Sequence, residues 1–268
     1  MRPLAVILVL ASLALLAVPS AVLSPTTDAA TPVPCRDPRG CPDMSIDLPQ
    51  LYVGHQDQVN IPANSCLITE GYVPGPGLHT LLRFDIGAPN LGAGDLVLGA
   101  PWDNPDLFFF SSCHNHWHLR DYVTTRVWTV TGWASWELLR QQNPDWTAAQ
   151  TFAAHPELLA ETTFAAKISF CAVDVYPMPA NQGGATVPDL QKYTECDDQG
   201  VSKGWSDLYI WSQTGNWADI TGLAPGLYML EAEVNTNRIF QESSYANNRG
   251  AVPVVVYPCE LDVCDLPV

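Results

Sequence analysis

The sequence predicts a mainly β protein, a single β-sandwich-type catalytic domain with long loops and one short helical insertion. Short apolar segments rich in β-branched and aromatic residues recur along the chain, separated by clusters of Gly, Pro and Asn. One interval, 134–165, carries helix-start signals instead. With 268 residues, 47% of them hydrophobic, the chain has enough material for a substantial core.

The predicted strands are period-two patterns or short apolar runs bounded by turn residues. They cover 50–53, 78–86, 95–98, 122–130, 167–175, 208–211, 227–234 and 252–257. Inside the insertion, Asn143, Pro144 and Asp145 are typical of a helix cap and first turn, and Pro156 opens a second short turn.

Four segments are expected along the chain. Residues 1–24 are typical of a secretory signal peptide, with Arg2, an apolar run and then small residues. An uncleaved membrane anchor is the alternative interpretation of that run. Residues 25–42 form a Pro/Thr/Ala-rich linker or N-terminal tail, 43–258 the folded domain, and 259–268 a C-terminal tail with a pair of cysteines.

Cysteine content and charge restrict the function classes. The eight cysteines show no CxxC spacing, which in an exported chain favours disulfides over zinc knuckles. The net charge of −16 excludes nucleic acid as a probable partner, because phosphate binding needs a basic surface. An acidic surface attracts cationic ligands such as amines, although it equally serves solubility.

The most informative motif is a histidine triplet, His114, His116 and His118, which follows Cys113. On an extended strand these three imidazoles share one face. The outer two alpha carbons then lie about 13 Å apart, so all three rings can bind one metal only if the backbone bends. Neutral imidazole suits Cu(II), Zn(II), Ni(II) and Fe(II), so the triplet alone does not choose the metal.

The triplet by itself is compatible with two functions. A zinc ion with an open coordination position would activate water, as in a zinc-dependent hydrolase. A noncatalytic cell-surface β-sandwich could equally use the histidines only to hold a metal.

Several ordered blocks of the sequence resemble the lysyl oxidase family. The copper-binding segment of that family is similar to SCHNHWHLRDY (112–122). Four further similar blocks follow in the order of the family: AAKISFCAVD, DDQGVSKGWSDLY, WADITGLAPGLYMLEAEVN and ESSYANN. Upstream of the histidines, PDM, NSCLITEGY and HTLLRFD also resemble it. The resemblance covers 43–257, except for the helical insertion and the loop near 176–190.

The resemblance implies an activity and two cofactors. Cu(II) would bind the three histidines, and lysyl tyrosylquinone would form from Lys167 and Tyr209. Copper and dioxygen would oxidise the phenol ring, to which the lysine amine adds. The expected reaction is oxidative deamination of primary amines, including peptidyl lysine as a candidate substrate, with release of aldehyde, ammonia and peroxide. The enzyme would be secreted, with no membrane partner once the signal is removed.

A carboxylate base would have to remove a proton from the substrate. Asp207 is the chosen candidate because it shares a strand face with Tyr209. Asp121, which follows the histidines, and Asp219, in the next strand, are the other candidates.

The resemblance also implies a calcium site and one disulfide. Oxygen ligands suit this hard ion, and Ser244 stands where the family has an aspartate. The disulfide would join Cys113 to Cys196, leaving Cys66 and Cys171 to pair with each other or with Cys35 or Cys41, and Cys259 to pair with Cys264. The implied calcium positions are Asp43, the backbone of Met44, Glu242, Ser244, Asn247 and Asn248.

Overall fold

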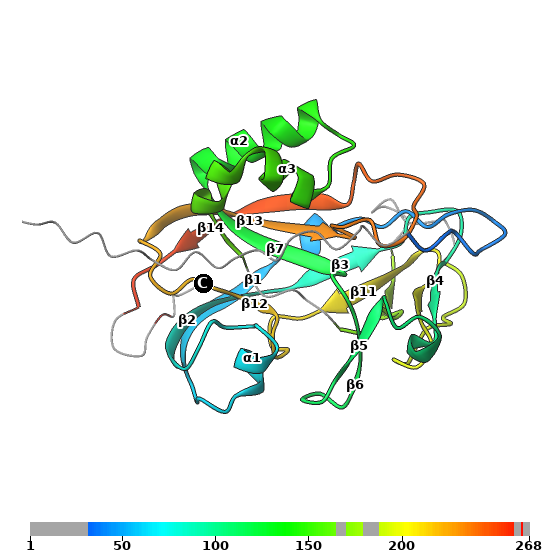
Figure 1. Cartoon of the computed structure of the whole chain (residues 1–268), viewed down its shortest axis with the longest axis horizontal. Coiled ribbons are helices and arrows are strands. Elements are labelled where there is room, and N and C mark those ends of the chain that lie inside the picture. Colours follow the sequence, from blue (N-terminus) through cyan, green and yellow to red (C-terminus); the bar gives the residue numbers. More distant parts are fainter. Residues whose placement is uncertain (1–31, 165–169, 179–187, 260–263, 265–268) are drawn as a thin grey trace, which may run out of the picture. The chain divides into compact units, whose positions relative to one another are not determined.

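Two antiparallel sheets form the main body of the fold (Figure 1). The computed structural model describes residues 32–164, 170–178, 188–259 and 264. One sheet has the strand order β1-β2-β12, and the other has the order β14-β13-β7-β8. Their bounds are β1 (Val53–Ile61), β2 (Gly77–Phe84), β12 (Trp217–Asp219), β14 (Arg249–Val256), β13 (Gly226–Val234), β7 (Val123–Thr129) and β8 (Thr162–Phe164).

The main hydrophobic core takes side chains from both sheets. Leu82 and Phe84 of β2 belong to the same buried cluster as Val127 of β7 and Leu230 of β13. Alternate residues of a strand point to opposite faces, so the neighbours of Val127 and Leu230 face away from this core. The expectation of a mainly β fold is confirmed.

Three smaller sheets carry the residues of chemical interest. They are β3-β11-β9, β10-β4 and the two-stranded β5-β6 hairpin. Their bounds are β3 (Ile86–Pro89), β11 (Trp205–Tyr209), β9 (Tyr176–Pro177), β10 (Gln199–Val201), β4 (Leu96–Gly99), β5 (Phe108–Ser111) and β6 (His116–Leu119).

Five of the eight predicted strands are confirmed, and the other three differ from the structure. β2, β4, β7, β13 and β14 lie within a few residues of their predicted ranges. The strand predicted at 50–53 is wrong, because Leu48–Gln50 is a 3-10 helix and β1 begins at Val53. The strand predicted at 208–211 lies earlier, over Trp205–Tyr209. Of the strand predicted at 167–175, residues 170–175 are irregular and the rest lies outside the described residues.

The helical insertion begins earlier than predicted. Helix α2 (Val130–Gln142) starts after Thr129, whose side chain accepts a hydrogen bond from the N–H of Gly132. The predicted cap at Asn143 is wrong, because Asn143 ends α2. Helix α3 (Ala148–Ala154) has a capping box instead, made by Thr147 and Gln150.

The rest of the helical content is short. A 3-10 helix covers Pro156–Glu161, as the proline predicted, and others cover Leu48–Gln50 and Pro101–Asp103. Helix α1 (Cys66–Thr69) lies between β1 and β2. In the described part of the chain, no helix has the length and apolar content needed to cross a membrane. The predicted signal peptide lies outside the described residues.

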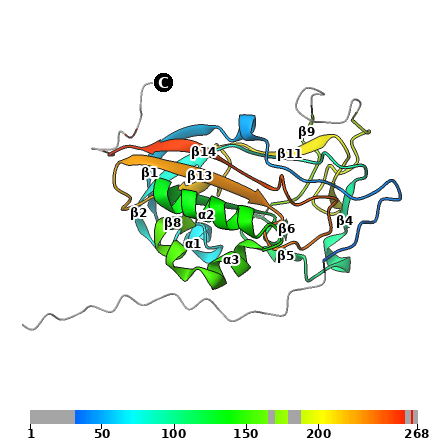
Figure 2. The same cartoon turned by 90° about the horizontal axis from the view of Figure 1, so that it is seen from above.

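Helices α2 and α3 cover the outer face of the β13 and β7 strands (Figure 2). Beneath them lies a buried ionic network with two positive and two negative side chains. Arg126 donates to Glu231 and to Glu233, at 3.1 and 3.0 Å, and Arg140 of α2 donates to Glu233 at 2.7 Å. All four side chains are almost fully buried, so their charges depend on one another.

Tryptophan side chains complete this network. The indole N–H groups of Trp128 and Trp136 both donate to Glu231, at 2.8 and 2.9 Å. The two rings lie 4.9 Å apart, and Phe152 of α3 stacks on both. The insertion is therefore attached to the sheet through two buried carboxylates, Glu231 and Glu233, away from the inner core.

Replacing this carboxylate is expected to destabilise the fold strongly. Glu231→Leu removes the acceptor that Arg126 shares with the indole N–H groups of Trp128 and Trp136. Arg126 then keeps only its bond to Glu233, and the two indoles lose their acceptor. The free energy of unfolding should fall by about 3 kcal/mol, the lower end of the range for breaking a buried ion pair. Glu137→Leu is the control, because the Glu137–Arg249 pair is partly exposed and should contribute no more than about 1 kcal/mol. Equal losses in urea unfolding would contradict this role.

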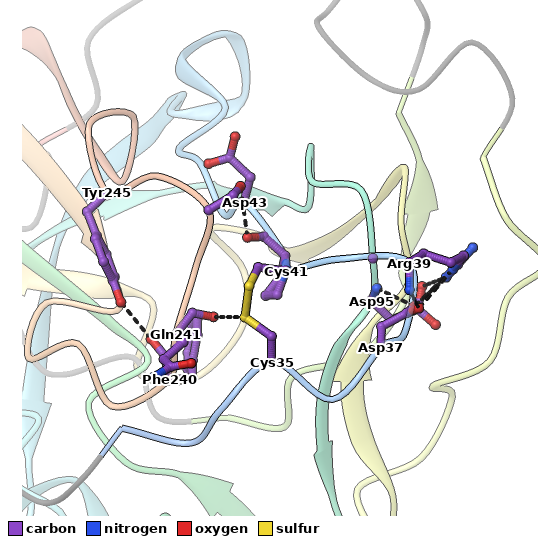
Figure 3. Close-up of a disulfide and its surroundings, with 12 residues drawn as sticks. Cys35, Asp37, Arg39, Cys41, Asp43, Asp95, Phe240, Gln241 and Tyr245 are labelled. Atoms are coloured by element: carbon purple, nitrogen blue, oxygen red, sulfur yellow. Dashed lines mark hydrogen bonds and ion pairs between the residues drawn. A yellow bond between two sulfur atoms is a disulfide. The ribbon is translucent and has the colours of Figure 1, made fainter.

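Residues 32–42 pack along the domain instead of extending away from it (Figure 3). The N–H of Val33 donates to Ile239 at 2.9 Å, and Cys35 is joined to Cys41. Arg39 pairs with Asp37 and with the buried Asp95. Residues 32–42, the described part of the predicted linker or N-terminal tail, are thus held against the domain by these contacts.

The disulfides differ from the predicted pairing. The bonds are Cys35–Cys41, Cys66–Cys113, Cys171–Cys196 and Cys259–Cys264. The predicted Cys113–Cys196 bond is wrong, and only the Cys259–Cys264 pair is as expected. Phe170 is hydrogen-bonded to Leu119 and Ala172 to Gly200, which brings Cys171 beside the segment that carries Cys196. Cys113 faces α1 instead, where Cys66 is the first residue.

Candidate metal centre

The three histidines lie on one short hairpin, but not on one straight strand. His116 and His118 are on β6, opposite Ser111 and Phe109 of β5. His114 comes from the turn before β6, in which Asn115 has a positive φ of 57°. Asparagine tolerates this left-handed conformation better than most residues. The turn supplies the bend that the spacing requires.

The bend brings three ring nitrogens together. Nε2 of His118 lies 3.0 Å from Nε2 of His116 and 3.3 Å from Nδ1 of His114. All three ligand atoms lie within 4.8 Å of one another. Two nitrogens bound to one metal at about 2.0–2.1 Å are separated by about 3–3.4 Å. The geometry therefore fits a single three-histidine metal centre.

The electrostatics of the site also suit a metal. Burial lowers the pKa of His116, and His114 lowers it further. Burial together with the two neighbouring imidazoles lowers the pKa of His118 to about 3. These rings therefore prefer the neutral form that binds metals. The donor set fits Cu(II), and it equally fits Zn(II).

An aromatic ring connects the histidines with Tyr209. The ring centroid of Phe170 lies 5.6 Å from that of His118 and 5.1 Å from that of Tyr209. The disulfide that follows Phe170 lies beside His116, whose ring is within 4.8 Å of both sulfur atoms. Sequence analysis missed Phe170, whose only signal is its position three residues after Lys167.

Asp207 and Tyr209 form a buried acid–phenol pair on β11. The hydroxyl of Tyr209 donates to Oδ2 of Asp207 at 2.5 Å and lies 3.0 Å from the backbone oxygen of Cys171. Burial raises the pKa of Asp207 well above its ordinary value, and burial and the nearby Asp207 raise the pKa of Tyr209. The second oxygen of Asp207 is buried and has no hydrogen-bond partner among the described residues.

The other two candidate bases are engaged elsewhere. Asp219 accepts from His79 at 2.7 Å and from the hydroxyl and N–H of Thr221. Asp121 occupies the turn between β6 and β7 and accepts from Asn237 at 3.1 Å. Of the three carboxylates, Asp207 is the one hydrogen-bonded to Tyr209. Lys167 lies outside the described residues.

A second cluster gathers most of the predicted calcium positions. Glu242 is buried and accepts from the N–H of Met44 and from the side-chain amide of Asn248, both at 2.6 Å. Asp43 is hydrogen-bonded to Asn247. Ser244 uses its hydroxyl locally, to accept from the N–H of Ala246.

This second cluster has an excess of oxygen acceptors. Side-chain oxygens of Asp43, Asn247 and Asn248 are buried and have no hydrogen-bond partner among the described residues. Burial raises the pKa of Glu242 to about 7, and Asp43 adds to the increase. A hard cation would satisfy such oxygens and offset their charge.

Comparison with known proteins places this arrangement in a family. The sequence profile of the lysyl oxidase family matches residues 75–260, more than half of the chain. The chain belongs to the lysyl oxidase family. The matched region contains the three histidines, Asp207 and Tyr209.

Individual relatives agree with this assignment. Human lysyl oxidase homolog 2 is 27% identical over 178 residues, which cover 65% of this chain and 18% of the relative. Human lysyl oxidase homolog 1 is 28% identical over 229 residues, which cover 80% of this chain and 33% of the relative. The chicken homolog 2 is 26% identical over 208 residues, 75% of this chain and 21% of the relative. The matches thus span a third or less of these relatives.

Proposed function

We propose that this member of the lysyl oxidase family is a copper-dependent amine oxidase that uses lysyl tyrosylquinone made from Lys167 and Tyr209. It would deaminate primary amines oxidatively, releasing an aldehyde, ammonia and hydrogen peroxide. Family membership supports an oxidase of this general kind. The observation that carries the proposal is the contact of Phe170 with both His118 and Tyr209, which keeps the phenol one aromatic ring away from the metal centre.

The position of Lys167 in the sequence is compatible with the proposed cofactor. Phe170 is the third residue after Lys167, so chain connectivity limits the distance between their alpha carbons to about 11 Å. Phe170 is itself in contact with Tyr209. A primary amine is required to add to an oxidised phenol ring, and the chain has only two other lysines, Lys192 and Lys203.

The residues of the chain would then have distinct roles. Bound copper supplies the chemistry with dioxygen that quinone assembly needs, and the quinone supplies an electrophilic carbonyl for the substrate amine. His114, His116 and His118 hold the metal. Asp207 orients the oxygen of Tyr209 and, with its raised pKa, is a suitable acceptor for the proton lost from the substrate carbon. Phe170 shields this pair from water.

The surroundings of the enzyme are part of the proposal. Four disulfides fit an oxidising compartment, so we propose that the chain acts outside the cell. The net charge of −16 favours the approach of cationic amines, with small amines and the lysine side chains of proteins as the two substrate classes to compare.

A carbonyl reagent tests this function. Purified protein loaded with copper in the presence of dioxygen should react with phenylhydrazine to give a visible absorption band, and it should release peroxide with a primary amine. Lys167→Ala and Tyr209→Phe should each abolish both signals, whereas Lys192→Ala should retain them. A band of wild-type intensity in the Lys167 and Tyr209 variants would rule out the proposed cofactor.

We also propose that the cluster around Asp43 and Glu242 binds calcium. Calcium should raise the melting temperature of copper-free protein. The free energy of unfolding should increase by about 2.7 kcal/mol when the calcium concentration is 100 times the Kd. Asp43→Ala should remove this shift, because it deletes a carboxylate with an unsatisfied oxygen. Asp57→Ala, on the surface of β1, should keep it. An unchanged melting temperature on adding calcium to wild type would contradict the site.

A further inference from the structure

Glu70 lies beside the metal centre but outside the region matched by the family profile. It directly follows α1, and its N–H donates to the backbone oxygen of Cys66 at 2.8 Å. Its side chain is about 10% exposed. The profile match begins at residue 75, and although the NSCLITEGY block that resembles the family contains Glu70, the resemblance assigns this carboxylate no role.

Both oxygens of Glu70 face the histidine hairpin. One oxygen accepts a short hydrogen bond from the hydroxyl of Ser111. The other lies 3.6 Å from Nδ1 of His114, is buried, and has no hydrogen-bond partner among the described residues. This distance is too long for a hydrogen bond, but it places the carboxylate in direct contact with the ring. The carboxylate is therefore desolvated next to one of the candidate metal ligands.

His114 is the histidine that most needs external support. Pairing of β6 with β5 fixes His116 and His118, whereas His114 lies in the turn. Its backbone N–H donates to the hydroxyl of Ser111 at 3.0 Å, and this hydroxyl donates to Glu70. The neighbouring Cys113 is bonded to Cys66, at the other end of α1. Helix α1 thus contacts the turn through a disulfide and through Glu70.

The negative charge of the Glu70 carboxylate is favourable at this buried position only when a cation is bound nearby. A buried carboxylate without a full set of hydrogen bonds is costly. A divalent ion on three neutral imidazoles carries two positive charges into a partly buried site, and a carboxylate nearby offsets them. Glu70 lies nearest Nδ1 of His114, the same nitrogen that converges with the other two rings, so it would act on the bound ion mainly through its charge. Losing an outer partner of a metal centre typically weakens metal binding about 10–100-fold.

From these contacts we infer that Glu70 is a positioning residue of the metal centre, which holds His114 in place and offsets the charge of the bound copper. The inference rests on the proposed copper site. It assigns to α1 and the residue that follows it the role of fixing the one ligand that the strand does not fix. Ser111 is the second member of this arrangement.

Copper affinity, measured by competition with a chelator in oxygen-free buffer, tests this role without relying on activity. Glu70→Gln keeps an acceptor for Ser111 and removes the charge, so the Kd for Cu(II) should rise about 10–100-fold. Glu70→Asp retains the charge and should keep an affinity closer to wild type. Electron paramagnetic resonance of the bound Cu(II) should change in Glu70→Gln, because the environment of one imidazole changes.

Glu157→Gln is the matched control, because Glu157 also lies beside a histidine, His155, at 3.1 Å, but on the surface. It should leave both the affinity and the resonance spectrum unchanged. If wild type binds copper, and Glu70→Gln has a Kd within twofold of the wild-type value and the same spectrum, the inference about Glu70 is overturned. The proposed function is not affected by that result. Wild type that fails to bind copper would overturn both this inference and the proposed function.

Discussion

His118→Ala is expected to eliminate tight copper binding and, with it, formation of the quinone. The side chain is fully buried, and its Nε2 is within 3.3 Å of ring nitrogens of both other histidines. Removing a direct ligand should cost more than the roughly 100-fold upper value for an outer carboxylate partner. Chelator competition gives the Kd, and the phenylhydrazine band reports the quinone in the same sample.

Because His118 is buried, His118→Ala could also disturb the fold, so a second variant is needed. His116 is only partly buried, so His116→Ala should disturb the fold less while weakening copper binding similarly. His155→Ala, which changes a histidine outside the site, should leave the Kd and the absorption band unchanged. Copper binding at wild-type strength in folded His116→Ala and His118→Ala would mean that the metal is held elsewhere.

The second large effect is expected from Asp207→Asn, which should lower kcat by about 100- to 10,000-fold per quinone formed. The substitution keeps the size of the side chain and its place beside Tyr209, but it removes the group that accepts the proton. Because Asp207 also contacts the precursor tyrosine, quinone content must be titrated with phenylhydrazine and kcat expressed per quinone.

The same measurement compares the three carboxylates. Asp121→Asn and Asp219→Asn should each lower kcat per quinone far less, because those side chains contact Asn237 and His79 and not Tyr209. A larger loss in either variant than in Asp207→Asn would contradict the assignment of the base.

The sheet elements that carry the core could be predicted because each combines length with regular alternation. In β13, for example, Leu230, Ala232 and Val234 face the core and alternate with the charged residues that face the helices. β5 and β6 were missed because β6 consists largely of the histidine motif, which reads as polar. The start of α2 was missed because Val130 continues the strand pattern, and only the hydroxyl of Thr129 marks the cap.

The candidate site could be predicted only in part. Histidines two residues apart share a strand face, so the spacing predicted both their convergence and the need for a bend. The sequence did not show which residue makes the bend. In the structure Asn115 makes it, through its left-handed backbone conformation. Phe170 and Glu70 join the site through pairings between distant segments, which no local pattern encodes. Disulfide connectivity depends on the same long-range contacts.

A crosslink between Lys167 and Tyr209 is the most direct measure of the central proposal. Protein expressed with copper and dioxygen should be digested after its disulfides, which include Cys171–Cys196, have been reduced, and its peptides analysed by mass spectrometry. We expect one branched peptide that joins the segments containing Lys167 and Tyr209, absent from protein prepared without copper and from Lys167→Ala. Unmodified Lys167 and Tyr209 peptides in full yield from copper-loaded protein would contradict the oxidase and leave a metal-binding β-sandwich.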